Sequence, residues 1–239
     1  MLDTGARRAL AATRFGDVTW VAEATSTNDE VAVRARAGAP EGVVVVADVQ
    51  TGGRGRRGRS WEAPAGSSLL VSVLLRPPRP HLALVAAGLA ALDACRSLAG
   101  VEVALKWPND LVVDGHGKLA GILAEAADGA VVVGLGLNVD WGTTPLPAGA
   151  TSLALVAGAE VERPRLLVAY LVALERRCRQ APDALMAAYR AACSTIGRHV
   201  RVELPGATSL EGRATGVDDE GRLIVDGHPV AAGDVVHLR

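Results

Sequence analysis

The sequence is poor in cysteine and in uninterrupted apolar segments, and both shortages exclude classes of protein. Only three cysteines occur in 239 residues, at Cys95, Cys178 and Cys193. Their number is odd and their spacing does not match a metal site, so we expect reduced thiols rather than a disulfide framework. The N-terminus lacks an apolar signal core, and the apolar run from Leu82 is interrupted at Asp93. We therefore expect a cytoplasmic protein with neither an export signal nor a membrane span.

An excess of charge is also missing. Twenty-five Lys and Arg residues oppose 26 Asp and Glu residues, which gives a formal net charge of −1. This balance argues against a polycation that binds along nucleic acid. Aromatic residues make up only 3% of the chain, but hydrophobic residues make up 49%. A chain of this length and composition is long enough for one sizeable core and a small second domain.

Lysine and asparagine are rare, and their positions are informative. The only lysines are Lys106 and Lys118, and the only asparagines are Asn28, Asn109 and Asn138. A lysine ammonium is a compact charge with three donors, suited to one phosphate or carboxylate oxygen. Turns favour Asn and surfaces favour Lys, which would explain either residue alone. Both types gather in a few segments, so we predict a binding site around residues 106–125.

Runs of apolar residues predict an α/β (α+β) fold with a mixed sheet and flanking helices. The expected strands are residues 43–49, 68–75, 101–105, 111–113, 118–126 and 131–137. The expected helices are residues 25–37, 82–98, 164–179 and 183–193, the first with a capping box of Thr27 and Glu30. The first twenty residues are expected to be a short lead-in with at most a frayed helix. His116 lies between two glycines, where we expect a hairpin turn rather than a catalytic base.

The pattern changes near residue 197. About forty residues of short strands and glycine turns follow, which predicts a small β-barrel. We therefore divide the chain into a catalytic domain at residues 1–195 and a C-terminal domain at residues 196–239.

Residues 52–60 form a segment rich in glycine and arginine, with four residues of each type within eight positions. It has almost no apolar side chain to bury and its charges repel one another, so alone it should be mobile. Glycines allow a close approach of backbone to ligand, and one arginine guanidinium can bind two phosphate oxygens at once. The segment lacks the Gly-Lys-Ser/Thr of a phosphate-binding P-loop. Composition leaves open a solvated basic loop or an RNA-binding segment, but the position between two buried strands favours an anion-binding loop.

The candidate residues together favour binding of phosphates and a carboxylate. The Gly/Arg segment, the two lysines, and Gln50, Asn109 and Asn138 at strand ends are suited to hold such groups in line. Catalysis of that kind depends on positioning and on neutralisation of charge. A flexible anion-binding loop can also order over a reactive intermediate and exclude water. No Ser-His-Asp set, metal-ligand cluster or reactive cysteine stands out in the sequence.

Several motifs occur in an order that resembles one enzyme family. They are Ser26-Thr27-Asn28, the run GRGRRGR at 53–59 followed by Trp61, KWPND at 106–110, KLAGI at 118–122, and GLN at 136–138. Over roughly residues 20–140 the chain resembles the biotin protein ligases, which join biotin to a carrier-protein lysine through biotinyl-5′-AMP. The C-terminal barrel, SH3-like in that family, lies in its expected place. One motif would be weak evidence for the family, but several in the family's order are specific.

The resemblance implies a role for each matching residue. Biotin would contact Ser26, Thr27, Asn28, Gln50, Arg54, Gly55, Arg56, Lys118, Gly121 and Ile122. ATP or the adenylate would contact Arg54, Arg56, Arg57, Arg59, Trp61, Lys106 and Asn138. Lys118 and Arg56 would be catalytic, because Lys118 would neutralise the carboxylate and then the α-phosphate. Asp110 would lie at the magnesium side.

The implied activity needs ATP and Mg²⁺, uses biotin as substrate, and modifies the biotin carboxyl carrier protein of an acyl-CoA carboxylase. A monomer or a weak homodimer is expected, with no membrane partner. Some relatives carry an N-terminal helix-turn-helix, but only about twenty residues precede the catalytic region here, so we expect no DNA binding. Two alternatives stay open: a lipoate or octanoate ligase or transferase of the same fold, and a nucleic-acid-binding module that uses the Gly/Arg segment.

Overall fold

The computed structural model describes residues 2–204, 206 and 208–238. Its helices are α1 (Thr4–Ala11), α2 (Thr27–Arg36), α3 (His81–Ala99), α4 (Leu153–Ala157), α5 (Arg163–Cys178) and α6 (Pro182–Ala192), with a short 3₁₀ helix, η1 (Arg56–Gly58). Its first strands are β1 (Val18–Ala24), β2 (Val44–Gln50), β3 (Ser68–Leu75), β4 (Ala104–Lys106), β5 (Asp110–Val113), β6 (Gly117–Ala127) and β7 (Ala130–Asn138). The remaining strands are β8 (His199–Glu203), β9 (Ser209–Val217), β10 (Leu223–Val225), β11 (His228–Val230) and β12 (Asp234–His237).

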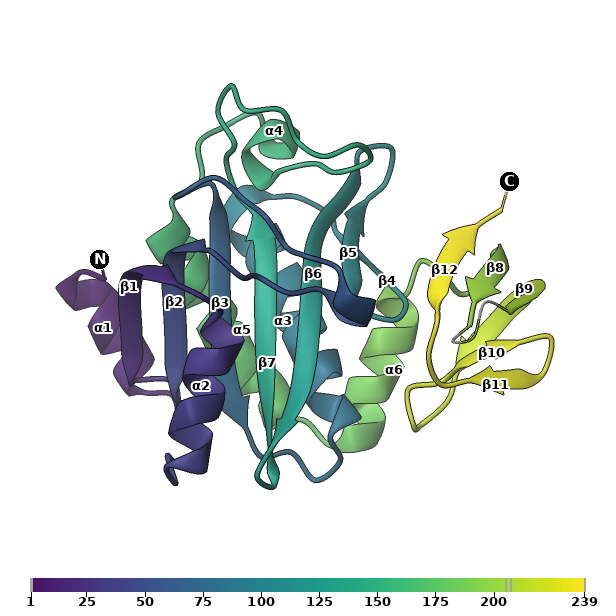
Figure 1. Cartoon of the computed structure of the whole chain (residues 1–239), viewed down its shortest axis with the longest axis horizontal. Coiled ribbons are helices and arrows are strands. Elements are labelled where there is room, and N and C mark those ends of the chain that lie inside the picture. Colours follow the sequence, from purple (N-terminus) through teal and green to yellow (C-terminus); the bar gives the residue numbers. More distant parts are fainter. Residues whose placement is uncertain (1, 205, 207, 239) are drawn as a thin grey trace.

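The first seven strands form one mixed sheet. Their order is β1-β2-β3-β7-β6-β5-β4, and β1 pairs with β2 in parallel while the other neighbours are antiparallel. Helix α2 lies on one face of this sheet, and α3 and α5 lie on the other (Figure 1). All eight residues of β3 are buried, as expected for a strand covered on both faces. The expectation of an α/β fold with a mixed sheet and flanking helices is confirmed.

Helix α3 forms the centre of the core behind the sheet. It ends at Gly100, whose left-handed backbone (φ 65°) provides a typical C-terminal cap. By length and mean hydropathy, 1.6 over its apolar window, α3 would be long enough to cross a membrane. However, 61% of that window is buried inside the protein, which is also typical of the core helix of a globular fold.

Strands β8 to β12 form a separate antiparallel sheet in the order β11-β10-β9-β8-β12. Its interior is built from small and branched apolar residues, among them Val200, Val202 and Val225. The two sheets meet at Trp107, whose indole Nε1 donates to the carbonyl of Gly221 at 2.9 Å. The predicted change to short strands near residue 197 is thus confirmed as a five-stranded antiparallel sheet.

Local expectations from the sequence are wrong at several places. Strand β1 begins inside the segment expected to be only a lead-in, and six of its seven residues are half-buried or exposed, so no long apolar run marks it. The strand expected at 101–105 is limited to Ala104–Lys106, and the short helix α4 was not predicted. The capping box at the start of α2 is absent. Ser26 is the N-cap without a side-chain cap bond, and the Thr27 hydroxyl turns to Gln50 instead.

Candidate active site

A cavity lies on the α2 face of the large sheet, beneath the segment that connects β2 to β3. This segment crosses in front of β7 and β6 (Figure 1). Most of the predicted site residues line the cavity: Ser26, Thr27, Asn28, Gln50, Arg54, Gly55, Arg56, Arg59, Trp61, Asp110, Lys118, Gly121 and Ile122. They come from the start of α2, the end of β2, the connecting segment and strands β5 and β6, so the fold brings together motifs that are far apart in the sequence.

The floor of the cavity is made by two glycines on neighbouring strands. Gly121 of β6 and Gly136 of β7 are paired in register, and the indole of Trp61 lies against both. A Cβ on Gly136 would stand 2.6 Å from Trp61 Cε2, and one on Gly121 would stand 3.2 Å from Cζ3. Only glycine therefore lets a flat ring approach the sheet here. The buried Nε1 of Trp61 has no hydrogen-bond partner in the part of the chain that the structure describes.

Lys118 supplies the ammonium group of the cavity. Its Nζ lies 2.8 Å from Asp110 Oδ1 on the neighbouring strand and 5.7 Å from the centre of the Trp61 ring. The side chain is 38% exposed, so the ammonium can still meet a ligand from solvent. One carboxylate uses only part of its donor capacity, because an ammonium has three N–H groups.

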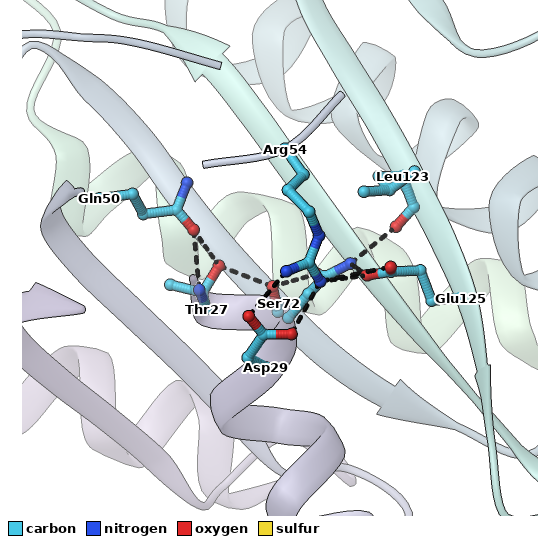
Figure 2. Close-up of polar contacts among 8 residues, drawn as sticks. Thr27, Asp29, Gln50, Arg54, Ser72, Leu123 and Glu125 are labelled. Carbon is cyan, nitrogen blue, oxygen red and sulfur yellow. Dashed lines mark hydrogen bonds and ion pairs between the residues drawn. The ribbon is translucent and has the colours of Figure 1, made fainter. Parts of the chain in front are cut away.

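Buried polar groups form the end of the cavity near α2. Gln50 Oε1 accepts from the Thr27 backbone N and from Thr27 Oγ1, at 2.8 and 2.9 Å. Ser72 Oγ lies 2.7 Å from Thr27 Oγ1 and 2.6 Å from Asn28 Oδ1, and its single proton serves one of these oxygens at a time. Figure 2 shows this chain of contacts from Gln50 through Thr27 to Ser72. Thr27, Asn28 and Ser72 are all buried, so their positions are fixed by the core.

The Gly/Arg segment is folded into a tight hairpin. Trp61 N donates to the carbonyl of Gly53 at 2.9 Å, and residues 54 and 60 form an isolated antiparallel bridge. At the tip, Arg57 and Gly58 have positive φ angles of 56° and 73°. The tip therefore takes up a conformation that glycine adopts easily and arginine rarely.

Three of the four arginines in this hairpin pair with carboxylates, which corrects the expectation of uncompensated repulsion. Arg54 pairs with Asp29 and Glu125. Arg57 and Arg59 both pair with Asp234 of the C-terminal sheet, at 3.3 and 2.7 Å. These partners lie far away in the sequence, so the composition of the segment alone did not indicate them.

Arg56 differs from the other three arginines. Its Nη1 lies 3.4 Å from Asn109 Oδ1 and 3.4 Å from the carbonyl of Gly233, both neutral acceptors. Burial lowers the pKa of Arg56, because a guanidinium charge is poorly solvated there. Within residues 2–204, 206 and 208–238, no carboxylate forms an ion pair with it. Arg56 is therefore the arginine best placed to bind an anionic ligand.

Three predicted residues do not line the cavity. Arg57 points to the C-terminal sheet, where it also donates to the carbonyls of Glu203 and Leu204. Lys106 lies on β4 and adds positive charge near His237. Asn138 is buried at the end of β7, where it donates to the carbonyl of Thr151 and accepts from Ser68 Oγ.

Protein ligands for a metal are few. No group of three or more His, Cys, Asp or Glu side chains suited to a metal ion occurs among the residues that the structure describes. Asp110, the implied metal ligand, is paired with Lys118. The cysteines do not offer a nucleophile either, since burial raises the pKa of Cys95 to about 12 and that of Cys178 to about 11.

Several residues that shape the site had no role predicted from the sequence: Asp29, Ser72, Glu125, Gly136 and Asp234. Ser72 had a detectable signal, because a serine inside the apolar run SLLVSVLL needs a buried partner. Asp29 looked like an ordinary acidic residue in the first turn of a helix. Glu125 and Asp234 acquire their roles only through contacts made in the folded protein, so no local pattern marked them.

Two family models match the chain. The model of the biotin/lipoate A/B protein ligase family matches residues 21–140, and the model of the biotin protein ligase C-terminal domain matches residues 195–238. The first match contains the cavity and the Gly/Arg hairpin, and the second covers the antiparallel C-terminal sheet.

Individual relatives agree with these matches. The chain is 46% identical over 235 residues to the biotin–[acetyl-CoA-carboxylase] ligase of Mycobacterium tuberculosis, covering 92% of this chain and 88% of that protein. The biotin protein ligase from Aquifex aeolicus in complex with biotin and ATP has a TM-score of 0.80 over 94% of this chain and all of that chain. The two sequences are 24% identical, so this likeness shows a shared fold. The Leishmania major enzyme in complex with biotinyl-5-AMP has a TM-score of 0.67 and 26% identity over 93% of this chain and 98% of that chain. The chain therefore belongs to the biotin protein ligase family and is a ligase.

Proposed function

We propose that this ligase converts biotin and ATP to biotinyl-5′-AMP and then transfers biotin to a lysine of a biotin carboxyl carrier protein. The observation that carries the proposal is that Lys118, Arg56 and the hydrogen-bonded pair of Thr27 and Gln50 lie around one cavity. A cationic end and a neutral polar end suit a ligand with a carboxylate at one end and a ureido ring at the other. The 46% identity to a biotin–[acetyl-CoA-carboxylase] ligase supports acetyl-CoA carboxylase as the source of the carrier.

In the first step, a carboxylate oxygen of biotin attacks the α-phosphorus of ATP and pyrophosphate leaves. Both reactants are anions, so the protein lowers the barrier mainly by offsetting their negative charge. Lys118 and Arg56 supply that charge at the cavity. Because their positions are held by Asp110 and Asn109, little reorganisation is needed during the reaction.

Magnesium would enter with ATP. Mg²⁺ commonly binds through one or two carboxylates and the substrate phosphates rather than in an all-protein cage. Asp110 provides one such carboxylate at the cavity, so the residues present fit an ion carried by the nucleotide. Bound there, the ion would neutralise phosphate charge, with Asp110 as the carboxylate that would hold it.

In the second step, the amine of the carrier lysine attacks the acyl carbon of the mixed anhydride and AMP leaves. The protein needs no nucleophile of its own for this transfer, which agrees with the raised pKa values of the buried cysteines Cys95 and Cys178. Its task is to keep water away from the anhydride until the lysine arrives. The Gly/Arg hairpin, which covers the cavity, performs that task.

The remaining assignments belong to the same proposal. Ser26, Thr27 and Gln50 bind the ureido end of biotin, Gly121 and Ile122 line its path, and Trp61 flanks the adenine. Asn138 and Lys106 act on the nucleotide side, which is supported only by the family resemblance. The boundary between the domains falls at residues 195 and 196. The protein acts in the cytoplasm as a monomer or a weak homodimer and does not bind DNA.

A lipoate ligase is the second candidate, because the family model that matches residues 21–140 covers lipoate ligases as well. The match of residues 195–238 to the biotin protein ligase C-terminal domain favours biotin.

Mass spectrometry of a purified carrier domain tests the proposal. We expect one biotinyl group on the carrier after incubation with the protein, biotin and MgATP. A carrier whose target lysine is replaced by arginine should stay unmodified. Modification with lipoate in place of biotin, or none with either acid, would contradict the proposal.

A further inference from the structure

We infer that Asp29 and Glu125 are positioning residues that hold the Gly/Arg hairpin over the cavity by gripping Arg54. Arg54 then serves as the anchor of the hairpin, while Arg56 remains available for the anionic substrate. The inference deepens the proposed function and rests on it only for its consequences in catalysis. We call the contacts of Arg54 with Asp29 and Glu125 the carboxylate anchor.

The geometry of the carboxylate anchor is well defined. Arg54 Nη1 and Nη2 each lie 2.7 Å from one oxygen of Asp29, so this pair is bidentate. Nη2 also donates to Glu125, at 3.1 and 3.3 Å from its two oxygens. Two parallel charge-assisted bonds are the strongest form of Arg–carboxylate contact. The anchor thereby joins the hairpin to α2 and to β6 (Figure 2).

Glu125 is itself fixed from the buried side. Asn28 is only 5% exposed, and its Nδ2 donates to Glu125 Oε2 at 2.5 Å. The Oδ1 of Asn28 accepts from Ser72 Oγ, which fixes the amide group. Position 134 on β7 must be glycine for this arrangement, because a Cβ there would collide with Asn28 Oδ1. A flexible exposed glutamate would gain little from one arginine. A glutamate held by a buried asparagine has already lost much of its side-chain conformational entropy, so its ion pair with the arginine forms at a lower entropic cost.

The contacts also separate the roles of the arginines. Two carboxylates share the single guanidinium of Arg54, so this group has no surplus positive charge for a phosphate. A phosphate bound to Arg54 would face both Asp29 and Glu125 at close range. Arg56 lies two residues further along and donates only to neutral acceptors, so its N–H groups are not already paired with a carboxylate, although Asp110 and Asp234 lie near it.

Limited trypsin digestion without substrates tests the carboxylate anchor directly. Proteolysis of a segment that opens reversibly follows the population of its open form. We expect Glu125→Gln and Asp29→Asn to be cut within residues 52–60 at least about five-fold faster than the parent protein. Glu102→Gln is the matched control, since it removes an exposed Arg96–Glu102 pair of 2.7 Å elsewhere and should leave this cleavage unchanged. Equal rates in all four proteins would overturn the inference.

Thermal melting establishes that each variant is folded. Should Glu125→Gln not fold because Asn28 loses its partner, Asp29→Asn carries the test alone, as the Asp29 side chain is half exposed. This digestion uses neither biotin nor ATP. Its outcome is therefore independent of whether the chain ligates biotin.

The ratio of AMP released to biotin transferred distinguishes an open hairpin from a general loss of protein stability, because a general loss would lower both quantities together. We expect Glu125→Gln to form the adenylate but to release several-fold more AMP per biotin transferred, because an open hairpin exposes the anhydride to water. Arg56→Ala should instead lose adenylate formation. An unchanged ratio in Glu125→Gln, or Arg54→Ala losing adenylate formation as completely as Arg56→Ala, would contradict the inference. Absence of biotin-dependent AMP from the parent protein would contradict the proposed function instead.

Discussion

At the scale of single residues, the site contains several cations, and the contacts of each one determine whether it is free to bind an anionic ligand. Lys118 shares its ammonium with one carboxylate, Asp110, and keeps 38% of its side chain exposed. Arg54 is fully engaged by Asp29 and Glu125, whereas Arg56 meets neutral oxygens. The sequence showed that these cations gather in two motifs, but it did not show which carboxylate pairs with which cation. That distinction arises from β5 and β6 lying side by side and from α2 facing the hairpin.

Replacement of Lys118 by alanine should abolish most adenylate formation without unfolding the protein. Loss of one charged contact that strengthens in the transition state costs about 2–4 kcal/mol, or roughly 10²–10³ in rate. Biotin-dependent ATP–pyrophosphate exchange measures the effect. Lys118→Arg keeps the charge and should retain more activity than Lys118→Ala. Near-normal exchange in a folded Lys118→Ala protein would remove this lysine from the mechanism.

Replacement of Gly136 by alanine should displace the Trp61 indole, because the added Cβ would lie 2.6 Å from Cε2 of the ring. Overpacking of this size costs about 1–3 kcal/mol, so we expect the KM for ATP to rise roughly ten-fold. Gly216→Ala in β9 is the matched control, since a Cβ there meets no atom within 4 Å. An unchanged KM for ATP in Gly136→Ala would show that the indole does not flank the nucleotide.

At the scale of elements, the reliability of prediction followed the strength of the local pattern. The run at 68–75 was predicted with the bounds that β3 has, and the helix expected at 82–98 differs from α3 by one residue at each end. These elements are predominantly apolar, so burial and local preference agree. The folded form of the Gly/Arg hairpin was not predictable, because its stabilising carboxylates come from α2, β6 and β12. The dependence of its order on ligand stays a prediction.

Binding of biotin with ATP should slow tryptic cleavage between Arg54 and Arg59. Each ordered residue costs about 1–2 kcal/mol of conformational entropy, so the exposed ion pairs of the hairpin offset only part of the cost of ordering it. Biotin supplies an apolar surface for the hairpin backbone, and the adenylate phosphate binds Arg56. ATP alone should protect far less than both ligands together. Identical digestion with and without ligands would show that the hairpin does not close over them.

At the scale of the whole molecule, the large sheet and the C-terminal sheet are joined by direct contacts of the KWPND segment and the hairpin. Trp107 of the KWPND segment donates its backbone N–H to Thr195 Oγ1 at 3.1 Å, and this hydroxyl lies 3.2 Å from His237 Nε2 in β12. Asp234 of the same strand holds Arg57 and Arg59 of the hairpin. The sequence predicted a second domain near residue 197 from its turn pattern. It did not predict these contacts, because Asp234 and His237 have no local signal.

The junction at His237 should weaken in acid. Burial, with Lys106 and Arg198 nearby, lowers the pKa of His237 to about 4, whereas an unfolded histidine titrates near 6.5. Between these values the unfolded chain binds more protons, so the free energy of unfolding falls as the pH falls from about 6.5 to about 4. Thermal melts at pH 7 and pH 5 should show a larger loss for the parent protein than for His237→Gln. Equal losses would show that this histidine does not couple folding to pH.

The central claim, that this chain activates biotin as an adenylate, is tested most directly by ATP–pyrophosphate exchange. The exchange is measured with biotin, with lipoate and with neither acid, in the presence of Mg²⁺. Radiolabel from pyrophosphate should enter ATP only when biotin is present, because pyrophosphate is released and recaptured only when the biotin carboxylate attacks the α-phosphate. Exchange that requires lipoate, or exchange equally fast without either acid, would contradict the account.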